Sequence, residues 1–206
     1  MASIKIYGVP PSTFTRAVRM GCHEKGIDYE LVAMFPGQMG ALNPFLKIPA
    51  VTHGDLTLFE SAAILRYLDS SFPGPKLWPS DLRSAAIVDQ WVAAVGDAVL
   101  NSAQRYMASR FGFIPVPAEM AKRYLDKTRE VLGVFDRQLA KGRFLAGNTF
   151  SAADIQLAPP LFYFPYIPEL AAMLDDAPNC RRWMKEIEGR PSFTATEPPQ
   201  KPPLAK

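Results

Sequence analysis

The sequence predicts two architectures in succession: a small domain in which strands and helices alternate, and then a larger domain of helices alone. Three observations support this prediction. At the start of the chain, patterns of period two and of helical spacing follow one another in the order β-α-β and then β-β-α. A stretch rich in proline and glycine, Phe72 to Lys76, indicates a linker. After this linker the strand patterns stop, and the apolar residues recur only at helical spacing.

The first half of the small domain has the pattern of a strand, a helix and a second strand. β-Branched and polar residues alternate from Ser3 to Tyr7, which predicts the first strand. Two prolines and a Ser-Thr pair then open a helix, which Gly26 is expected to end. We expect the charged residues of this helix, Arg16 among them, on its solvent face. Tyr29 to Met34 is the second strand, and a unit of this size favours a right-handed parallel crossover.

A hairpin and a second helix complete the small domain. Ala50 to Thr52 and Leu56 to Phe59 are short strands, and the sequence His-Gly-Asp between them is typical of a hairpin. Pro49 stands at the entrance to the first of these strands, where a proline cannot donate a backbone hydrogen bond. Ser61 to Asp69 then has the apolar spacing of a helix.

The second domain shows longer amphipathic patterns. Tyr124 to Leu139 predicts a long helix, and Asn179 to Glu188 predicts the last one. Ser151 and Asp154 have the spacing of a capping box, with Asp in place of the usual Glu, before an apolar helix that we expect to be buried. Another long helix precedes these, and its predicted inner stripe consists of Ala86, Ile87, Gln90, Trp91, Ala94, Val95, Ala98, Val99 and Ala103.

The composition argues against several function classes. The chain has 206 residues, 48% of them apolar, and 23 basic against 20 acidic residues leave a net charge of +3. No basic block stands out, so no nucleic-acid partner is indicated. Two cysteines make neither a disulfide framework nor a metal site, which favours a reducing, cytoplasmic setting and no metal. The longest apolar run, Leu157 to Ile167, is too short for a membrane span, and the first residues lack a signal-peptide pattern.

Four stretches carry a family resemblance. "LFESAAILRYL" after "IPAV", "EKGIDYELV" after the first helix, "FLAGNTFSAADI" and "WMKEIEGRPSF" together resemble cytosolic glutathione transferases, in order, over nearly the whole chain. The stretch "YGVPPSTFTRAV" is most similar to serine-type members, the phi class and its bacterial relatives. The resemblance implies a thioredoxin-like domain over residues 1–76 that binds glutathione, and an all-helical domain over residues 84–206. It also implies a cytoplasmic homodimer with a role in detoxification.

The resemblance assigns the glutathione contacts in the small domain. Pro49 is expected in the cis form, which presents the backbone of Ile48 to the cysteinyl part of glutathione as an added strand would. Ser61 is expected to bind the γ-glutamyl carboxylate at a helix start, and Glu60 the amino end. Serine-type relatives hold the glycine carboxylate with basic residues in a longer segment after the second strand. Here that segment has no Lys, Arg or His, and Lys47 is the nearest cation.

Catalysis in this family requires glutathione as a thiolate. A free thiol has a pKa of about 8.5, so a hydroxyl donor is needed to stabilise the anion at neutral pH. The resemblance places Ser12 in this role, at the start of the first helix. Thr13 is the alternative, because one of the two hydroxyls can cap the helix while the other faces the thiol. Tyr7 is a further alternative inside the first strand, whereas Cys22 falls on the apolar helix face and is expected in the core.

The second substrate is expected in an apolar cleft. The candidate walls are Pro11 and Phe35 from the small domain and Tyr106 and Phe111 from the helical domain. The leading hypothesis is a transferase that joins the glutathione thiolate to small electrophiles, with peroxide reduction as a side activity. The alternative is a non-catalytic module of the same fold that binds or scaffolds, which the short segment after the second strand favours.

Overall fold

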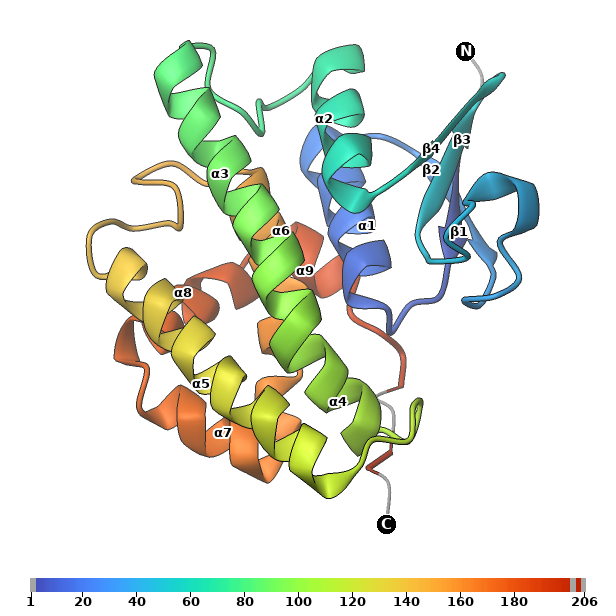
Figure 1. Ribbon diagram of the computed structural model, residues 1–206. Coiled ribbons are helices and arrows are strands. Elements are labelled where there is room, and N and C mark those ends of the chain that lie inside the picture. Colours follow the sequence, from blue (N-terminus) through green and yellow to red (C-terminus); the bar gives the residue numbers. More distant parts are fainter. Residues whose placement is uncertain (1–2, 201–202, 205–206) are drawn as a thin grey trace. The chain divides into compact units, whose positions relative to one another are not determined.

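The computed structural model describes residues 3–200, 203 and 204. The chain forms two compact units. One contains the N-terminal part up to Pro79 and a late segment that begins at Gly189; the other runs from Ser80 to Glu188. The order of strands and helices confirms a thioredoxin-like α/β domain followed by a helical domain. Figure 1 shows the elements of each unit, and none of the described helices is long and apolar enough to cross a membrane.

The N-terminal unit contains a four-stranded sheet in the order β2-β1-β3-β4. β1 (Ile4–Gly8) is parallel to β2 (Tyr29–Ala33), while β3 (Ala50–His53) is antiparallel to both β1 and β4 (Leu56–Phe59). The predicted strands are therefore confirmed, with ends that differ by one residue at most. Helices α1 (Thr13–Lys25) and α2 (Ser61–Ser71) pack against each other beside the sheet (Figure 1). A short 3-10 turn, η1 (Gly40–Leu42), and helix α9 (Pro191–Ala195) complete the described elements of this unit.

The core of this unit follows the two periods of its sequence. In a strand, alternate side chains share a face, and in a helix the residues three and four apart share one. Cys22 belongs to this core, and its burial raises the pKa of its thiol to about 12, so it is a packing residue as expected. The core cluster consists of Ile4, Ile6, Val18, Cys22, Val51, Ile64 and Leu68.

The prediction that Arg16 faces solvent is wrong. Its side chain is fully buried, because α9 packs against the face of α1 that sequence periodicity marks as polar. A polar helix face can be covered when the covering segment supplies acceptors for its charged groups. Here that segment comes from the other end of the chain.

The regular secondary structure in the described part of the second unit is helical, apart from an isolated bridge between Phe144 and Gly147. A π-helical turn, η2, links α3 to α4, and η3 is a 3-10 turn after α6. Prolines begin α7 and α8 at the first helical position, where a missing N–H is tolerated. The elements are α3 (Leu82–Val99), η2 (Leu100–Gln104), α4 (Arg105–Arg110), α5 (Ala118–Leu139), α6 (Ala152–Phe162), η3 (Phe164–Tyr166), α7 (Pro168–Asp175) and α8 (Pro178–Glu188).

The predicted inner stripe of α3 is wrong in its first turns. Ala86, Ile87 and Gln90 are exposed, and Ile87 retains 39% of its accessible surface. The buried stripe is offset by one residue at the start of the helix, where Ala85 and Val88 are buried in place of Ala86 and Ile87. The buried residues of α3 are Ala85, Val88, Val92, Val95 and Val99.

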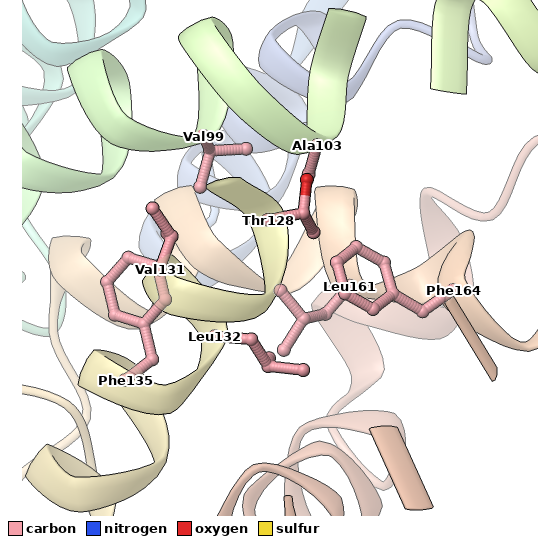
Figure 2. Close-up of a pocket in the computed structure, with 8 residues that line it drawn as sticks. All are labelled: Val99, Ala103, Thr128, Val131, Leu132, Phe135, Leu161 and Phe164. Atoms are coloured by element: carbon pink, nitrogen blue, oxygen red, sulfur yellow. The ribbon is translucent and has the colours of Figure 1, made fainter. Parts of the chain in front are cut away.

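Figure 2 shows a small cavity inside this unit. Its volume of about 10 Å³ is at most that of a single water, so it is no substrate site. Thr128 supplies a hydroxyl to its lining, and that hydroxyl already donates to the Tyr124 carbonyl at 2.7 Å. The lining residues are Val99, Ala103, Thr128, Val131, Leu132, Phe135, Leu161 and Phe164.

Asp154 organises the start of the buried helix α6. One carboxylate oxygen accepts from the Leu145 amide (2.9 Å) and the Trp183 indole (2.8 Å). The other accepts from the amide (2.9 Å) and hydroxyl (3.1 Å) of Ser151, which confirms the capping box. Burial raises the pKa of Asp154, and these donors act in the opposite direction. Four donors from three segments therefore depend on one side chain.

We predict that Asp154→Ala lowers the free energy of unfolding by about 3 kcal/mol, because the truncated network leaves buried donors without acceptors. Asp154→Asn should also be less stable than the parent, because the asparagine NH₂ group is a donor and cannot accept from the buried donors that it would face. Urea unfolding followed by circular dichroism measures both, with Asp175→Ala at an exposed site of α7 as the control. If Asp154→Ala is as stable as the control, the network does not have this role.

Candidate functional site

The register of the sheet brings three segments to one of its ends. Tyr7 of β1 pairs with Ala50, and Ala50 pairs with Phe59 of β4. Because β3 is antiparallel to both neighbours, β1 and β4 end where β3 begins. The chain that leaves β1, the chain that enters β3 and the chain that leaves β4 therefore lie side by side. Those segments contain Ser12, Pro49 and Ser61.

Two helices also begin at this end of the sheet. α1 follows β1 after a short loop, and α2 follows β4 directly. The first N–H groups of a helix have no partner within the helix, and the helix dipole adds partial positive charge there. Two such ends side by side favour an anionic ligand.

Ser12 is the N-cap of α1. Its hydroxyl oxygen accepts a hydrogen bond of 3.3 Å from the Thr15 amide. A serine hydroxyl has one proton to donate besides its acceptor capacity, and here no described residue takes that proton. The side chain is half-buried, so it remains accessible. Ser12 can therefore cap the helix and donate to a ligand atom at the same time.

The two alternatives to Ser12 have different surroundings. Thr13 is the first residue of α1, and only 3% of its surface is exposed. Tyr7 lies within β1, as expected, and its hydroxyl is 3.3 Å from the Thr52 hydroxyl of β3. Of the three hydroxyls, that of Ser12 is the accessible one at the helix start.

The peptide bond between Ile48 and Pro49 is cis, which confirms the expectation for this proline. Ile48 is half-buried, and neither its N–H nor its C=O bonds to any residue that the structure describes. An extended peptide could pair with these two groups as an added strand does. Buried Asn43 braces the preceding turn: its side chain donates to the Lys47 carbonyl at 2.8 Å and accepts from the Phe45 amide at 2.9 Å.

Glu60 and Ser61 form the start of α2. Glu60 has φ +66° and ψ 112°, a conformation that is uncommon for a residue with a side chain. Its side chain is exposed and makes no capping hydrogen bond, whereas Ser61 is buried with 7% exposure. Strained backbone of this kind clusters at binding sites, where it fixes the direction of functional groups.

The charged side chain next to Ile48 in the sequence is that of Lys47. Lys47 is exposed, and its ammonium forms no ion pair with a described residue. Gln38 lies in the loop before β3, and its side-chain carbonyl accepts from the Phe35 amide at 2.8 Å. This leaves its NH₂ group as a donor.

The residues expected around the second substrate lie in both units. In the N-terminal unit, Pro11 is half-buried and Phe35 is 59% exposed. In the helical unit, Tyr106 is 5% exposed, and burial together with the negative charge of Glu169 raises the pKa of its phenol. Phe111 is half-buried and makes an edge contact with Tyr163 at 5.5 Å. Their role toward a substrate stays a prediction.

Sequence patterns gave no indication of the conformation of Leu46. It has φ +55°, although its side chain is 45% exposed and little packing favours that conformation. Its amide donates to the Asn43 carbonyl and its carbonyl accepts from the Gly37 amide, both at 2.9 Å. Asn-Pro is a turn signal, so the turn was detectable from the sequence. The left-handed residue within it was not, because a leucine rarely adopts this conformation.

Comparison with known proteins identifies the family. The family model for the glutathione S-transferase N-terminal domain matches residues 6–76, and the model for the C-terminal domain matches residues 105–191. Glutathione S-transferase F13 of Arabidopsis thaliana is 30% identical, over 95% of each chain. Glutathione S-transferase 3 of Zea mays is 31% identical, over 95% of this chain and 94% of its own. The chain belongs to the glutathione S-transferase family, and these relatives are phi-class proteins of plants.

Solved structures agree with this assignment. Glutathione transferase F7 from Populus trichocarpa has a TM-score of 0.81 and 30% identity, over 94% of this chain and 97% of its own. Glutathione S-transferase III in its apo form has a TM-score of 0.85 and 32% identity, over 98% of this chain and 100% of its own. The similarity therefore extends over both units.

We predict that Leu46→Gly raises the free energy of unfolding by about 1 kcal/mol, because glycine adopts a positive φ without the steric penalty of a side chain. Urea unfolding measures the change. Leu82→Gly is the matched control, since Leu82 is 88% exposed at the first position of α3 and glycine there should lower stability. A loss of stability in Leu46→Gly equal to that of the control would show that the backbone at Leu46 is not strained.

Proposed function

We propose that this protein is a glutathione transferase that conjugates the glutathione thiolate to small electrophilic molecules. The sulfur of the ionised thiol forms a bond to an electrophilic carbon, and the leaving group departs with its electron pair. Peroxide reduction by the same thiolate is the proposed side activity. The observation that carries the proposal is the Ser12 hydroxyl proton at the start of α1, beside the backbone of Ile48; no residue that the structure describes accepts that proton or pairs with that backbone.

Ser12 supplies the hydrogen bond that stabilises the thiolate of glutathione, so that more of the thiol is ionised at neutral pH. A hydrogen bond to a charged group contributes roughly 1.5–3 kcal/mol, which corresponds to about one to two units of thiol pKa. The dipole of α1 acts in the same direction. Thr13 and Tyr7 remain the alternatives for this donor.

Glutathione is proposed to bind across the sheet end as an extended peptide. Ile48, before Pro49, pairs with its cysteinyl backbone. Ser61 and the first N–H groups of α2 bind the γ-glutamyl carboxylate, and Glu60 binds the amino group. Lys47 faces the glycine carboxylate. We keep residues 1–76 and 84–206 as the proposed glutathione-binding and helical domains.

A non-catalytic binding or scaffolding module of the same fold is less well supported. The relatives that match over nearly their whole length carry the name of the enzyme. Turnover of a generic aryl halide by the purified protein, at a rate that depends on glutathione concentration, is the expected result. Binding to immobilised glutathione without any turnover would favour the module.

We also propose how the protein assembles, where it is located and which role it has. A homodimer is supported by apolar side chains that α3 leaves exposed, with Leu82 at 88% and Ile87 at 39%. A cytoplasmic location is supported by two free cysteines, Cys22 and Cys180, both buried. Detoxification of electrophiles is the role that the proposed reaction fits.

We predict that Ser12→Ala lowers the turnover of glutathione conjugation at pH 7 by about tenfold to a hundredfold, because the thiolate loses a hydrogen bond to its charge. The Michaelis constant for glutathione should change little. Loss of the cap also costs about 0.5–2 kcal/mol of stability, so activity is measured well below the unfolding transition. Thr13→Val is the matched variant. A large loss of turnover in Thr13→Val but not in Ser12→Ala would transfer the role to Thr13.

We predict that Lys47→Ala raises the Michaelis constant for glutathione several-fold and leaves turnover nearly unchanged, as loss of uniform binding does. The effect is small because an exposed ion pair contributes only about 0–1 kcal/mol. The control ligand is γ-glutamylcysteine, which lacks the glycine, and both the parent and the variant are titrated with it. If Lys47→Ala weakens both ligands equally, or neither, Lys47 does not bind the glycine carboxylate.

A further inference from the structure

The segment from Gly189 to Thr196, here called the C-terminal strap, packs against α1. It follows the last long helix in sequence, yet its contacts assign it to the N-terminal unit. Ser192, Phe193 and Thr196 are buried, with at most 4% of their surface exposed. The strap is therefore an integral layer of the unit that contains the candidate glutathione site.

An ion pair fastens one end of the strap. Arg190 donates two hydrogen bonds to the Glu24 carboxylate, at 2.9 and 2.7 Å, and the Ser192 hydroxyl donates a third. Although burial acts in the opposite direction, the donors Arg190 and Ser192 hold the pKa of Glu24 below its ordinary value. Two parallel N–H···O bonds to one carboxylate fix orientation as well as distance.

Arg16 fastens the other end. Its guanidinium carbon lies 4.0 Å from the centre of the Phe193 ring, within the range of a cation–π contact. The group also donates to the Phe193 carbonyl at 2.9 Å and to the Thr196 hydroxyl at 3.4 Å. Arg19 adds a bond of 3.1 Å to the Thr196 carbonyl. The strap thus supplies two oriented acceptors and an aromatic ring to a fully buried cation.

The backbone of Arg16 lies close to the start of α1, and side chains on a helix lean toward its N-terminus. The Arg16 amide donates to the Ser12 carbonyl at 2.8 Å, so the two residues are one helical turn apart. A buried charge is screened less than an exposed one, so its field extends to an anion near Ser12. If the strap left α1, Arg16 would be hydrated and this field would weaken.

We propose that the C-terminal strap is a positioning element for catalysis: it holds Arg16 behind the start of α1 and so helps to keep the thiol of bound glutathione ionised. The inference rests on the proposed function, in which that helix start ionises glutathione. Arg16 is a positioning residue, because it acts from behind the helix. The other charged groups on α1 and on the elements packed against it are Arg19, His23, Glu24, Lys25, Lys5, Arg66, Asp69 and Arg190.

The test is the pKa of glutathione bound to the purified full-length protein, measured by thiolate absorbance against pH. Arg16→Met should raise this pKa by roughly one unit, because a unit charge at about 10 Å from an anion contributes about that much at an effective dielectric constant of about 20. Phe193→Leu keeps an apolar side chain but removes the ring that contacts Arg16. It should also raise the pKa of bound glutathione. Turnover of both variants should fall at pH 6.5 and approach that of the parent at high pH.

Arg143→Met is the matched control in the helical unit. Arg143 also lies over a phenylalanine ring, at 5.3 Å from Phe144, and pairs with Glu186 at 2.6 Å. The pKa of glutathione bound to Arg143→Met, and the pH profile of its turnover, should equal those of the parent. If Arg16→Met does not fold, Phe193→Leu decides the question.

An unchanged pKa of bound glutathione in the folded strap variants, with turnover lowered equally at all pH values, would assign the strap a structural role only. An equal rise in the pKa in Arg143→Met would also overturn the inference. If the parent itself binds glutathione without lowering its pKa, the proposed function fails instead, so the two failures are distinguishable.

Discussion

The antiparallel pairing of β3 with both β1 and β4 is the constraint on which the candidate site depends. The pairs Tyr7 with Ala50 and Ala50 with Phe59 fix where β1 and β4 end. A shift of one residue in this register would turn each side chain of β3 to the other face of the sheet. It would also remove the Ile48 backbone from the starts of α1 and α2. Hydrophobic packing of Val51 against the helices keeps the register in place.

The sequence predicted the elements whose signals are local. Strand alternation, the hairpin turn and the capping box at Ser151 each depend on residues close together in the chain, and the structure confirms them. The packing of α9 on α1 could not be predicted in this way, because Arg16 has the residue type and spacing of a solvent face. Its partners are more than 170 residues away. The inner stripe of α3 was misassigned at its start because positions 85 to 88 are all apolar, so their spacing alone does not fix which face is buried.

The candidate site was predictable to a similar extent. Chemistry-bearing residues with fixed neighbours, Ser12 before a helix and Pro49 before a strand, were identified from the resemblance and from turn signals. Backbone conformation was not predictable at Leu46 and Glu60, since positive φ is uncommon for both residue types. The brace by Asn43 is a consequence of that turn. The sequence therefore named the candidate groups, and the structure shows the backbone conformation around them.

The most direct test of this account is the amide hydrogen exchange of Ile48 in the presence of S-methylglutathione, measured by NMR. The ligand should slow exchange at Ile48 strongly, because the Ile48 N–H gains the strand-like hydrogen bond that no described residue supplies. Exchange in the loop around Gly112 of the helical unit serves as the reference. If calorimetry shows that the ligand binds while exchange at Ile48 is unchanged, glutathione does not bind along this sheet end, and the account is contradicted.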